Sequence, residues 1–294
     1  MSGGVLEPAP PFDFDLSLRF AAGFRPGSGE QVVDGGRLWK AFRVEGAAVA
    51  TRTESTGDAG RPRLAVEVAG AGRVDDAMGE AAVRRVADYL SIDDDLGPFL
   101  AIVAEDPPMA ARERELHGMH HVRFPGPFEA ACWAVLSQRQ PIPMARRVKD
   151  ALTERFGDAV EMDGHRLTAF PAAQVLAAAG EDAVAEVVRN PRRSRYLAAV
   201  TRAFVDVDDA FLRDAPVGEV EAWLRSIDGV GDWSTAFVLF RGLGRMETMP
   251  VTEPFLRAAR PLYGPGYTDD DLRAVAARYG PWAGYWGLYL RAPI

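Results

Sequence analysis

The hydrophobic pattern of this chain changes once, near residue 78, and that change constrains its fold more than any other feature. Before it, apolar and polar residues alternate in short runs such as Leu16, Leu18 and Phe20, separated by turn segments such as PGSGE. Alternation with a period of two predicts an antiparallel sheet. After it, apolar residues such as Val83 and Val86 recur at helical spacing. We therefore predict an α+β chain, with a small N-terminal antiparallel β domain followed by an all-α body.

Composition narrows the class of protein. The chain has 294 residues, of which 48% are hydrophobic, so it can bury a sizeable core. It shows no apolar run long enough for a membrane span and no signal-peptide pattern, so we expect a cytoplasmic protein. Its single cysteine, Cys132, lies in the apolar stretch FEAACWAVL, which predicts a buried, inert thiol. The net charge of -8 argues against a uniformly basic nucleic-acid binder but allows a local basic face.

The most informative motif is LRSIDGVGDWSTAFVLFRG, in which Gly229 and Gly231 bracket Val230 between two predicted helices. Two closely spaced glycines let the backbone turn tightly and bring its N–H groups, with the positive end of the next helix, against an anion. The pattern therefore suits a hairpin that holds a phosphate. A plain corner between two helices needs glycine as well, so the motif alone leaves both interpretations open.

The surroundings of this motif resemble the helix-hairpin-helix DNA glycosylases, and within them the AlkA type, 3-methyladenine DNA glycosylase II. PPFDFDLSLRFAAGF resembles the first strand of that family's β domain, FPGPFEAACWAVLSQRQPIPMARRV its DNA-wedge helix pair, and YGPWAGYWGLYLRA its last helix. The resemblance implies a helix-hairpin-helix body of two helical subdomains. The expected divisions are an N-terminal β domain (1–78), the first part of a helical subdomain (79–125), the subdomain with the hairpin (126–245), and C-terminal helices that complete the first subdomain (246–294).

The resemblance also assigns residues to DNA binding. Backbone amides of Gly229, Val230 and Gly231 would hold a DNA phosphate, which fixes the register of the protein on DNA without reading sequence. Arg139, in SQRQP, falls where the family inserts a side chain into the gap left by a flipped base, and Gln138 beside it is also assigned to DNA binding.

Three aromatic residues, Phe20, Trp233 and Phe237, fall on pocket positions of the family, where their faces would stack on the extruded base. Ordinary core aromatics at helical spacing are the alternative for each of them. Trp233 also stands where bifunctional members carry a Schiff-base lysine, so the resemblance implies a monofunctional enzyme without lyase chemistry.

The family's catalytic aspartate, expected at the start of the helix after the hairpin unit, has no direct counterpart in TMPVTEPFL. Alignment forward from the RG pair places Glu253 on it, and alignment backward from FLR places Thr252 there. We favour Glu253, because a helix N-terminus beside an apolar cleft both tolerates a carboxylate and makes it useful. A base alkylated at a ring nitrogen is already cationic and leaves readily, so an imperfect carboxylate narrows the expected substrates to alkylated purines.

The expected function is thus excision of alkylated purines in base excision repair, leaving an abasic site. The alternative is a glycosylase fold that binds damaged or distorted DNA with little or no catalysis. The expected partner is double-stranded DNA containing damaged bases, without a membrane or a cofactor, and the protein is expected to be a monomer associated with the nucleoid. His117, His120 and His121 in HGMHH have a spacing that suits a metal, but we expect a surface loop and no metal site there.

Overall fold

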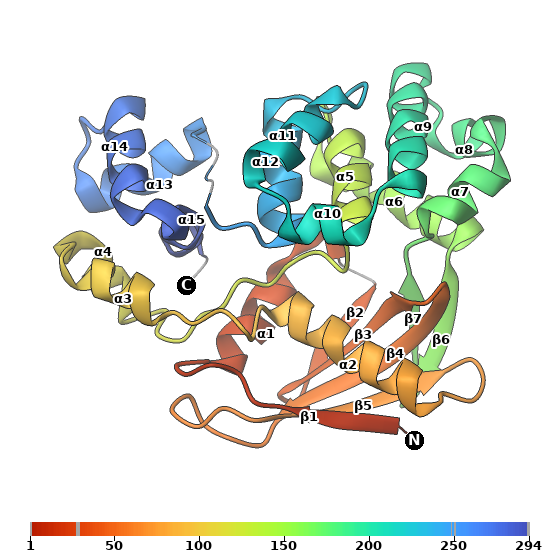
Figure 1. Cartoon of the computed structure of the whole chain (residues 1–294), viewed down its shortest axis with the longest axis horizontal. Coiled ribbons are helices and arrows are strands. Elements are labelled where there is room, and N and C mark those ends of the chain that lie inside the picture. The colour runs from red at the N-terminus through yellow and green to blue at the C-terminus, as the bar shows by residue number, and fades with distance from the viewer. Residues whose placement is uncertain (1, 28–29, 248, 250, 293–294) are drawn as a thin grey trace.

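The computed structural model describes residues 2–27, 30–247, 249 and 251–292. An antiparallel five-stranded sheet with the strand order β1-β5-β4-β3-β2 forms the N-terminal part, as the sequence predicts, and Figure 1 shows it below the helical body. Its strands are β1 (Ser2–Leu6), β2 (Gln31–Asp34), β3 (Arg37–Val44), β4 (Ala47–Ser55) and β5 (Leu64–Gly70). The helix α2 (Asp76–Leu90) packs on this sheet and shares its core, so that core extends beyond the expected boundary at residue 78.

The first predicted strand is wrong, because Leu16, Leu18 and Phe20 lie on a helix, α1 (Phe14–Gly23). Asp13 begins this helix, and its carboxylate accepts a hydrogen bond of 3.0 Å from the N–H of Leu16. Leu18 packs into the core of the sheet, whereas Leu16 packs into the core of the C-terminal helices. Asp15 and Arg19 form an exposed face, but the apolar residues on the wide buried side fall at alternate positions, which imitates the period of a strand.

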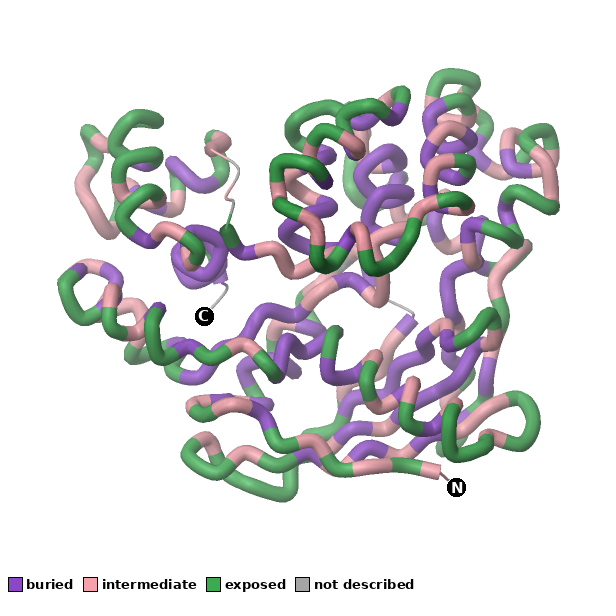
Figure 2. The backbone as a smooth tube through the Cα atoms, viewed as in Figure 1, coloured by how far each residue is buried: buried purple, intermediate pink, exposed green. Residues whose placement is uncertain are grey.

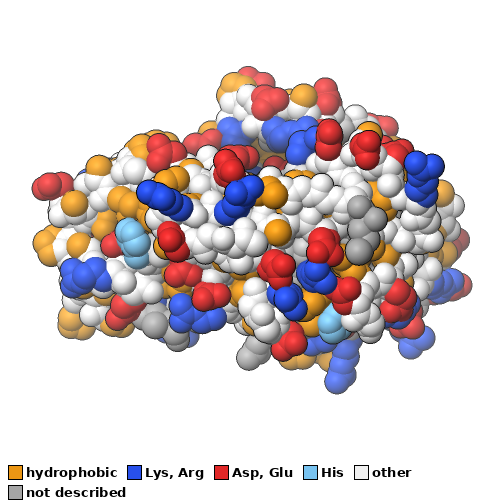
Figure 3. Space-filling model, turned by 90° about the horizontal axis from the view of Figure 1, so that it is seen from below, with side chains coloured by type: hydrophobic (Ala, Val, Ile, Leu, Met, Phe, Trp, Pro, Cys, Tyr) orange, Lys and Arg blue, Asp and Glu red, His pale blue; other side chains and the backbone are white. Residues whose placement is uncertain are grey.

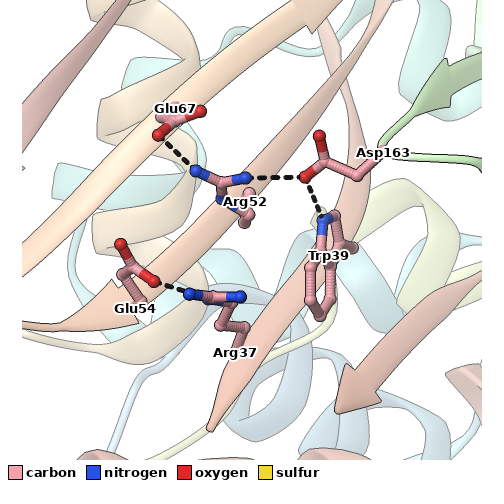
Figure 4. Close-up of polar contacts among 6 residues, drawn as sticks. All are labelled: Arg37, Trp39, Arg52, Glu54, Glu67 and Asp163. Carbon is pink, nitrogen blue, oxygen red and sulfur yellow. Dashed lines mark hydrogen bonds and ion pairs between the residues drawn. The ribbon is translucent and has the colours of Figure 1, made fainter. Parts of the chain in front are cut away.

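A β-hairpin interrupts the region predicted to be entirely helical, so that prediction is also wrong. It consists of β6 (Asp158–Met162) and β7 (His165–Ala169), joined by Asp163 and Gly164 at φ angles of 50° and 79°. Positive φ at both turn residues is what a two-residue hairpin turn of type I′ requires. The hairpin packs on β3 and β4, where Asp163 accepts 2.9 Å hydrogen bonds from Trp39 and Arg52 (Figure 4).

The helical body has two hydrophobic cores. The first is built largely from α5 (Pro127–Leu136), α6 (Ile142–Phe156), α7 (Ala173–Ala179), α8 (Glu181–Val188), α9 (Pro191–Asp206), α10 (Asp209–Asp214), α11 (Val217–Ser226) and the π-helical η2 (Val238–Leu243). The short helix α12 (Asp232–Phe237) lies between α11 and η2 in the chain. The second is built largely from α3 (Gly97–Ala104), α4 (Pro107–Glu113), α13 (Glu253–Tyr263), α14 (Asp269–Tyr279) and α15 (Ala283–Arg291). Two short 3-10 turns, η1 (Arg25–Gly27) and η3 (Gly280–Trp282), complete the elements. In Figure 2, α15 is buried along almost its whole length, and its residues belong to the second core.

The buried position predicted for Cys132 is confirmed. At the start of α14, Thr268 and Asp271 form a reciprocal capping box. The expected surface loop at the histidine cluster is wrong for His120 and His121, which are fully buried and bond backbone carbonyl groups.

No helix in the described part of the chain is long and apolar enough to cross a membrane. The face in Figure 3, seen from below the sheet, carries acidic and basic side chains interspersed.

Candidate active site

An apolar cavity of about 510 Å³ opens where α1, α12, η2, α13 and α15 meet. Its wall is mostly aromatic, with Phe20, Phe24, Trp133, Trp233, Phe237, Phe240 and Phe255 among its lining residues. We call it the aromatic cavity. It brings together Phe20, Trp233 and Phe237, which are more than 200 positions apart at the extremes and which the sequence analysis assigned to one pocket.

The rings of the aromatic cavity are positioned to present flat faces. Trp233 is 45% exposed, which is unusual for a tryptophan, and it stacks on Phe237 with ring centroids 5.2 Å apart and planes 23° apart. Phe20 stacks on Phe24 in the same way, with centroids 6.0 Å apart. An exposed aromatic face beside a cavity is not a core feature, so it favours a role in binding a flat ligand.

The hairpin between α11 and α12 needs its two glycines for different reasons. Gly229 has a φ of 88°, and a β-carbon there would lie 2.2 Å from the Tyr196 ring, so the fold itself requires glycine. A β-carbon on Gly231 would meet no atom within 4 Å, so the fold leaves that position free. Gln138 donates a 2.7 Å hydrogen bond to the carbonyl of Gly229 and thereby holds the hairpin against the end of α5.

A surface groove of about 850 Å³ runs along this hairpin, and we call it the hairpin groove. Arg139, Arg192 and Arg225 line it together with Gly229, Val230 and Gly231. Arg139 is exposed with a φ of 50°. The groove is not uniformly positive, because Asp232 pairs with Arg225 at 3.1 Å at the start of α12.

The cavity and the groove share Trp233 and Ser137, so a ligand in the hairpin groove lies at the mouth of the aromatic cavity. No protein-family profile matches the sequence. A DNA-3-methyladenine glycosylase of Bacillus subtilis is 25% identical to it over 216 residues, which are 72% of this chain and 71% of that protein. The solved structure of a 3-methyladenine DNA glycosylase from Archaeoglobus fulgidus superposes with a TM-score of 0.81 at 21% identity, covering 98% of this chain and 97% of the other.

A Clostridium acetobutylicum 8-oxoguanine glycosylase/lyase, solved with double-stranded DNA containing cytosine opposite 8-oxoguanine, superposes with a TM-score of 0.72 at 17% identity. That match covers 99% of this chain and 94% of the other. In sequence and in fold, the chain is similar to helix-hairpin-helix DNA glycosylases, and among them to the AlkA type.

Thr252 and Glu253 line different parts of the surface. Thr252 is the N-cap residue of α13 and lines the aromatic cavity, although its side chain makes no capping hydrogen bond. Glu253 lies instead in a shallow surface depression with Arg260 and Tyr267. Its side chain is 57% exposed, and its carboxylate is 3.8 Å from the Arg260 guanidinium. Among the described residues that line the aromatic cavity there is no carboxylate.

Two arginines line the aromatic cavity, and the sequence analysis assigned neither of them to the site. Arg241, on η2, is 7% exposed, and burial lowers its pKa to about 9, so it stays charged at neutral pH. Arg291, at the end of α15, is more exposed and lies over the Phe255 ring at 4.8 Å. The sequence carries a signal for the first, because Arg241 interrupts the apolar run AFVLF at a position facing the interior.

Proposed function

We propose that this chain is a monofunctional DNA glycosylase that draws a damaged purine out of duplex DNA into the aromatic cavity, cleaves its N-glycosidic bond and leaves an abasic site. The observation that carries the proposal is the aromatic cavity opening beside the hairpin groove. Flat aromatic faces bind an extruded base, while a glycine hairpin with nearby arginines binds the backbone that flanks it. The relatives named for 3-methyladenine support alkylated purines as the class of base.

The hairpin groove is the proposed site of DNA contact. The open space around Gly231 lets a phosphate approach the backbone closely, and Arg139 and Arg192 supply local positive charge. Arg139 is proposed to enter the gap in the duplex with Gln138 behind it, because Arg139 is exposed on a left-handed turn at the end of α5.

The placement of lysine supports a monofunctional reaction. Lysine occurs at only two positions in the sequence, Lys40 and Lys149, and both side chains are 1% exposed in the structure. Neither lines the aromatic cavity, whereas Trp233, which the resemblance aligns with the Schiff-base lysine, does. Among the described residues that line this cavity, there is no lysine amine to begin a covalent lyase step.

The chemical step is proposed to depend on Thr252. The Glu253 carboxylate lies outside the aromatic cavity, beside Arg260. Thr252 lines the cavity and begins α13, so its hydroxyl and the adjacent backbone N–H groups lie at the positive end of that helix. Glu253 could act only after its side chain leaves Arg260 and turns toward the cavity.

Single-turnover excision from duplexes with one defined lesion tests this function. The protein is incubated in excess with duplexes carrying hypoxanthine, 1,N6-ethenoadenine or 7-methylguanine, and alkali then cleaves the strand at abasic sites. We expect excision of at least one of these bases and no strand cleavage before alkali. Tight, lesion-dependent binding without excision of any base would instead show a DNA-binding protein that has lost catalysis.

A further inference from the structure

Arg241 is held rigidly beside the rings of the aromatic cavity. Its guanidinium carbon lies 4.9 Å from the centroid of Phe20 and 4.4 Å from that of Phe24. Its backbone is fixed as well, because its carbonyl group accepts a 2.7 Å hydrogen bond from the N–H of Phe124. The side chain is therefore positioned by its surroundings rather than free to reach solvent.

This guanidinium has no counter-ion in the part of the chain that the structure describes. Its Nη2 atom is buried without a hydrogen-bond partner, and no ion pair among those residues includes it. The groups whose charge acts on it are Tyr89, which burial keeps protonated by raising its pKa, and Arg291, which is also positive. A buried, unpaired cation destabilises a fold. A ligand that accepts hydrogen bonds from this guanidinium therefore binds with the free energy of an interaction that is missing in the free protein.

The geometry points to Arg241 as the residue that selects neutral damaged purines with hydrogen-bond acceptors over cationic ones. This inference rests on the proposed glycosylase function. Arg241 and Arg291 both line the aromatic cavity, where no described side chain is negative. A base alkylated to a cation meets two like charges there, whereas a neutral base offers ring nitrogens and carbonyl oxygens to the free N–H groups. 1,N6-ethenoadenine and hypoxanthine are both neutral, and both carry hydrogen-bond acceptors.

The same placement suits the chemistry of a neutral leaving base. When the bond from C1′ to the base nitrogen breaks, its electron pair stays on the base, which becomes an anion as the sugar becomes an oxocarbenium ion. Water then adds to C1′ and loses a proton. A proton is taken up by the purine anion, which leaves as the neutral free base. Arg241 keeps its own protons and stabilises the departing anion by charge and hydrogen bonding. A cationic base leaves neutral and gains nothing from this interaction.

Replacing Arg241 by methionine tests the inference, since methionine keeps the length and removes the charge. Single-turnover rates are compared on hypoxanthine and 1,N6-ethenoadenine against 7-methylguanine. We expect R241M to slow excision of the neutral bases by about tenfold or more and to leave 7-methylguanine excision unchanged or faster. R241K keeps the charge and should retain most of the discrimination. R37M, which removes an exposed arginine on the sheet (Figure 4), is the matched control and should change neither rate.

Binding separates failure of this inference from failure of the proposed function. Duplexes with uncleavable 2′-fluoroarabino nucleotides carry the same neutral and cationic bases, and their affinities need no catalysis. The wild type should bind the neutral lesions more tightly than the cationic one, and R241M should lose that preference while melting at an unchanged or higher temperature. An equal effect of R241M on both classes, with the fold retained, would overturn the inference even if excision is robust. If the wild type excises nothing, glycosylase function fails, and the binding preference still decides the role of Arg241.

Discussion

Thr252 lines the aromatic cavity, and one alignment of the family pattern places the catalytic carboxylate at this position, so Thr252→Asp would introduce a carboxylate there. The residue is the N-cap of α13, with φ and ψ of -142° and 159°, and aspartate adopts this extended conformation easily. Its carboxylate would project into the cavity that Thr252 already lines. The sugar of an extruded nucleotide becomes positive as the glycosidic bond breaks, so a negative charge beside it lowers the barrier.

The size of the effect follows from Coulomb's law. A carboxylate about 5 Å from the oxocarbenium centre, at an effective dielectric constant of about 20, is worth about 3 kcal/mol. Arg241 and Arg291 line the same cavity and offset part of this field. We therefore expect Thr252→Asp to raise the single-turnover rate about ten- to a hundredfold. Because Thr252 makes no capping hydrogen bond, aspartate should also stabilise the fold by about 0.5 to 1 kcal/mol.

Thr252→Asn is the matched control, since asparagine has nearly the same shape and caps helices equally well but carries no charge. Both variants should unfold at a slightly higher urea concentration than the wild type, while only the aspartate variant should gain activity. The rates are measured with enzyme in excess over a hypoxanthine duplex. If the aspartate and asparagine variants excise at the same rate, position 252 does not face the reacting sugar, and the placement of the catalytic centre in this cavity is refuted.

Three other outcomes are expected. Glu253→Gln should change single-turnover excision less than about twofold, because the carboxylate faces solvent and Arg260; a large loss would return Glu253 to the catalytic role. Gly231→Ala should weaken binding to any duplex in a fluorescence titration but melt at the wild-type temperature. Gly229→Ala should melt at a far lower temperature, because its β-carbon would collide with the Tyr196 ring. An equal loss of stability in both variants would show that the hairpin is only a corner between two helices. Asp163→Ala should lower the free energy of unfolding in urea by about 1 to 2 kcal/mol through two lost hydrogen bonds, and an unchanged value would show that the β6–β7 hairpin is held by its apolar face alone.

The sequence predicts the N-terminal sheet and the helical body because both obey simple hydrophobic periods. It fails at α1 because that helix contacts two cores, and the apolar residues of its wide buried side fall at alternate positions, as they would in a strand. It fails at the hairpin of β6 and β7 for a different reason. The Asp163–Gly164 pair is a hairpin signal in its own right, but the helical spacing on either side of the hairpin outweighed it in the interpretation.

The aromatic cavity was predictable only through resemblance, since its residues come from α1, α12 and η2, which no local pattern brings together. The choice between Thr252 and Glu253 was not predictable from sequence. Neighbouring residues at a helix start point about 100° apart, so a shift of one residue in the alignment decides which side chain enters the cavity. The structure supplies that direction, because it puts Thr252 in the aromatic cavity and Glu253 in the depression beside Arg260.

The threonine at position 252 and the unpaired Arg241 are best understood as one electrostatic arrangement. A carboxylate at position 252 would share the aromatic cavity with Arg241 and offset its charge, whereas Thr252 leaves the guanidinium unopposed. A carboxylate would stabilise the positive charge that develops on the sugar. The Arg241 guanidinium would instead stabilise the negative charge that develops on the leaving base. A cavity of this kind does little for a base that departs neutral, and it helps a base that departs as an anion. Under the proposed function, the absence of a carboxylate from the described cavity wall would change which lesions the site favours, and Arg241 would remain as a means of catalysis.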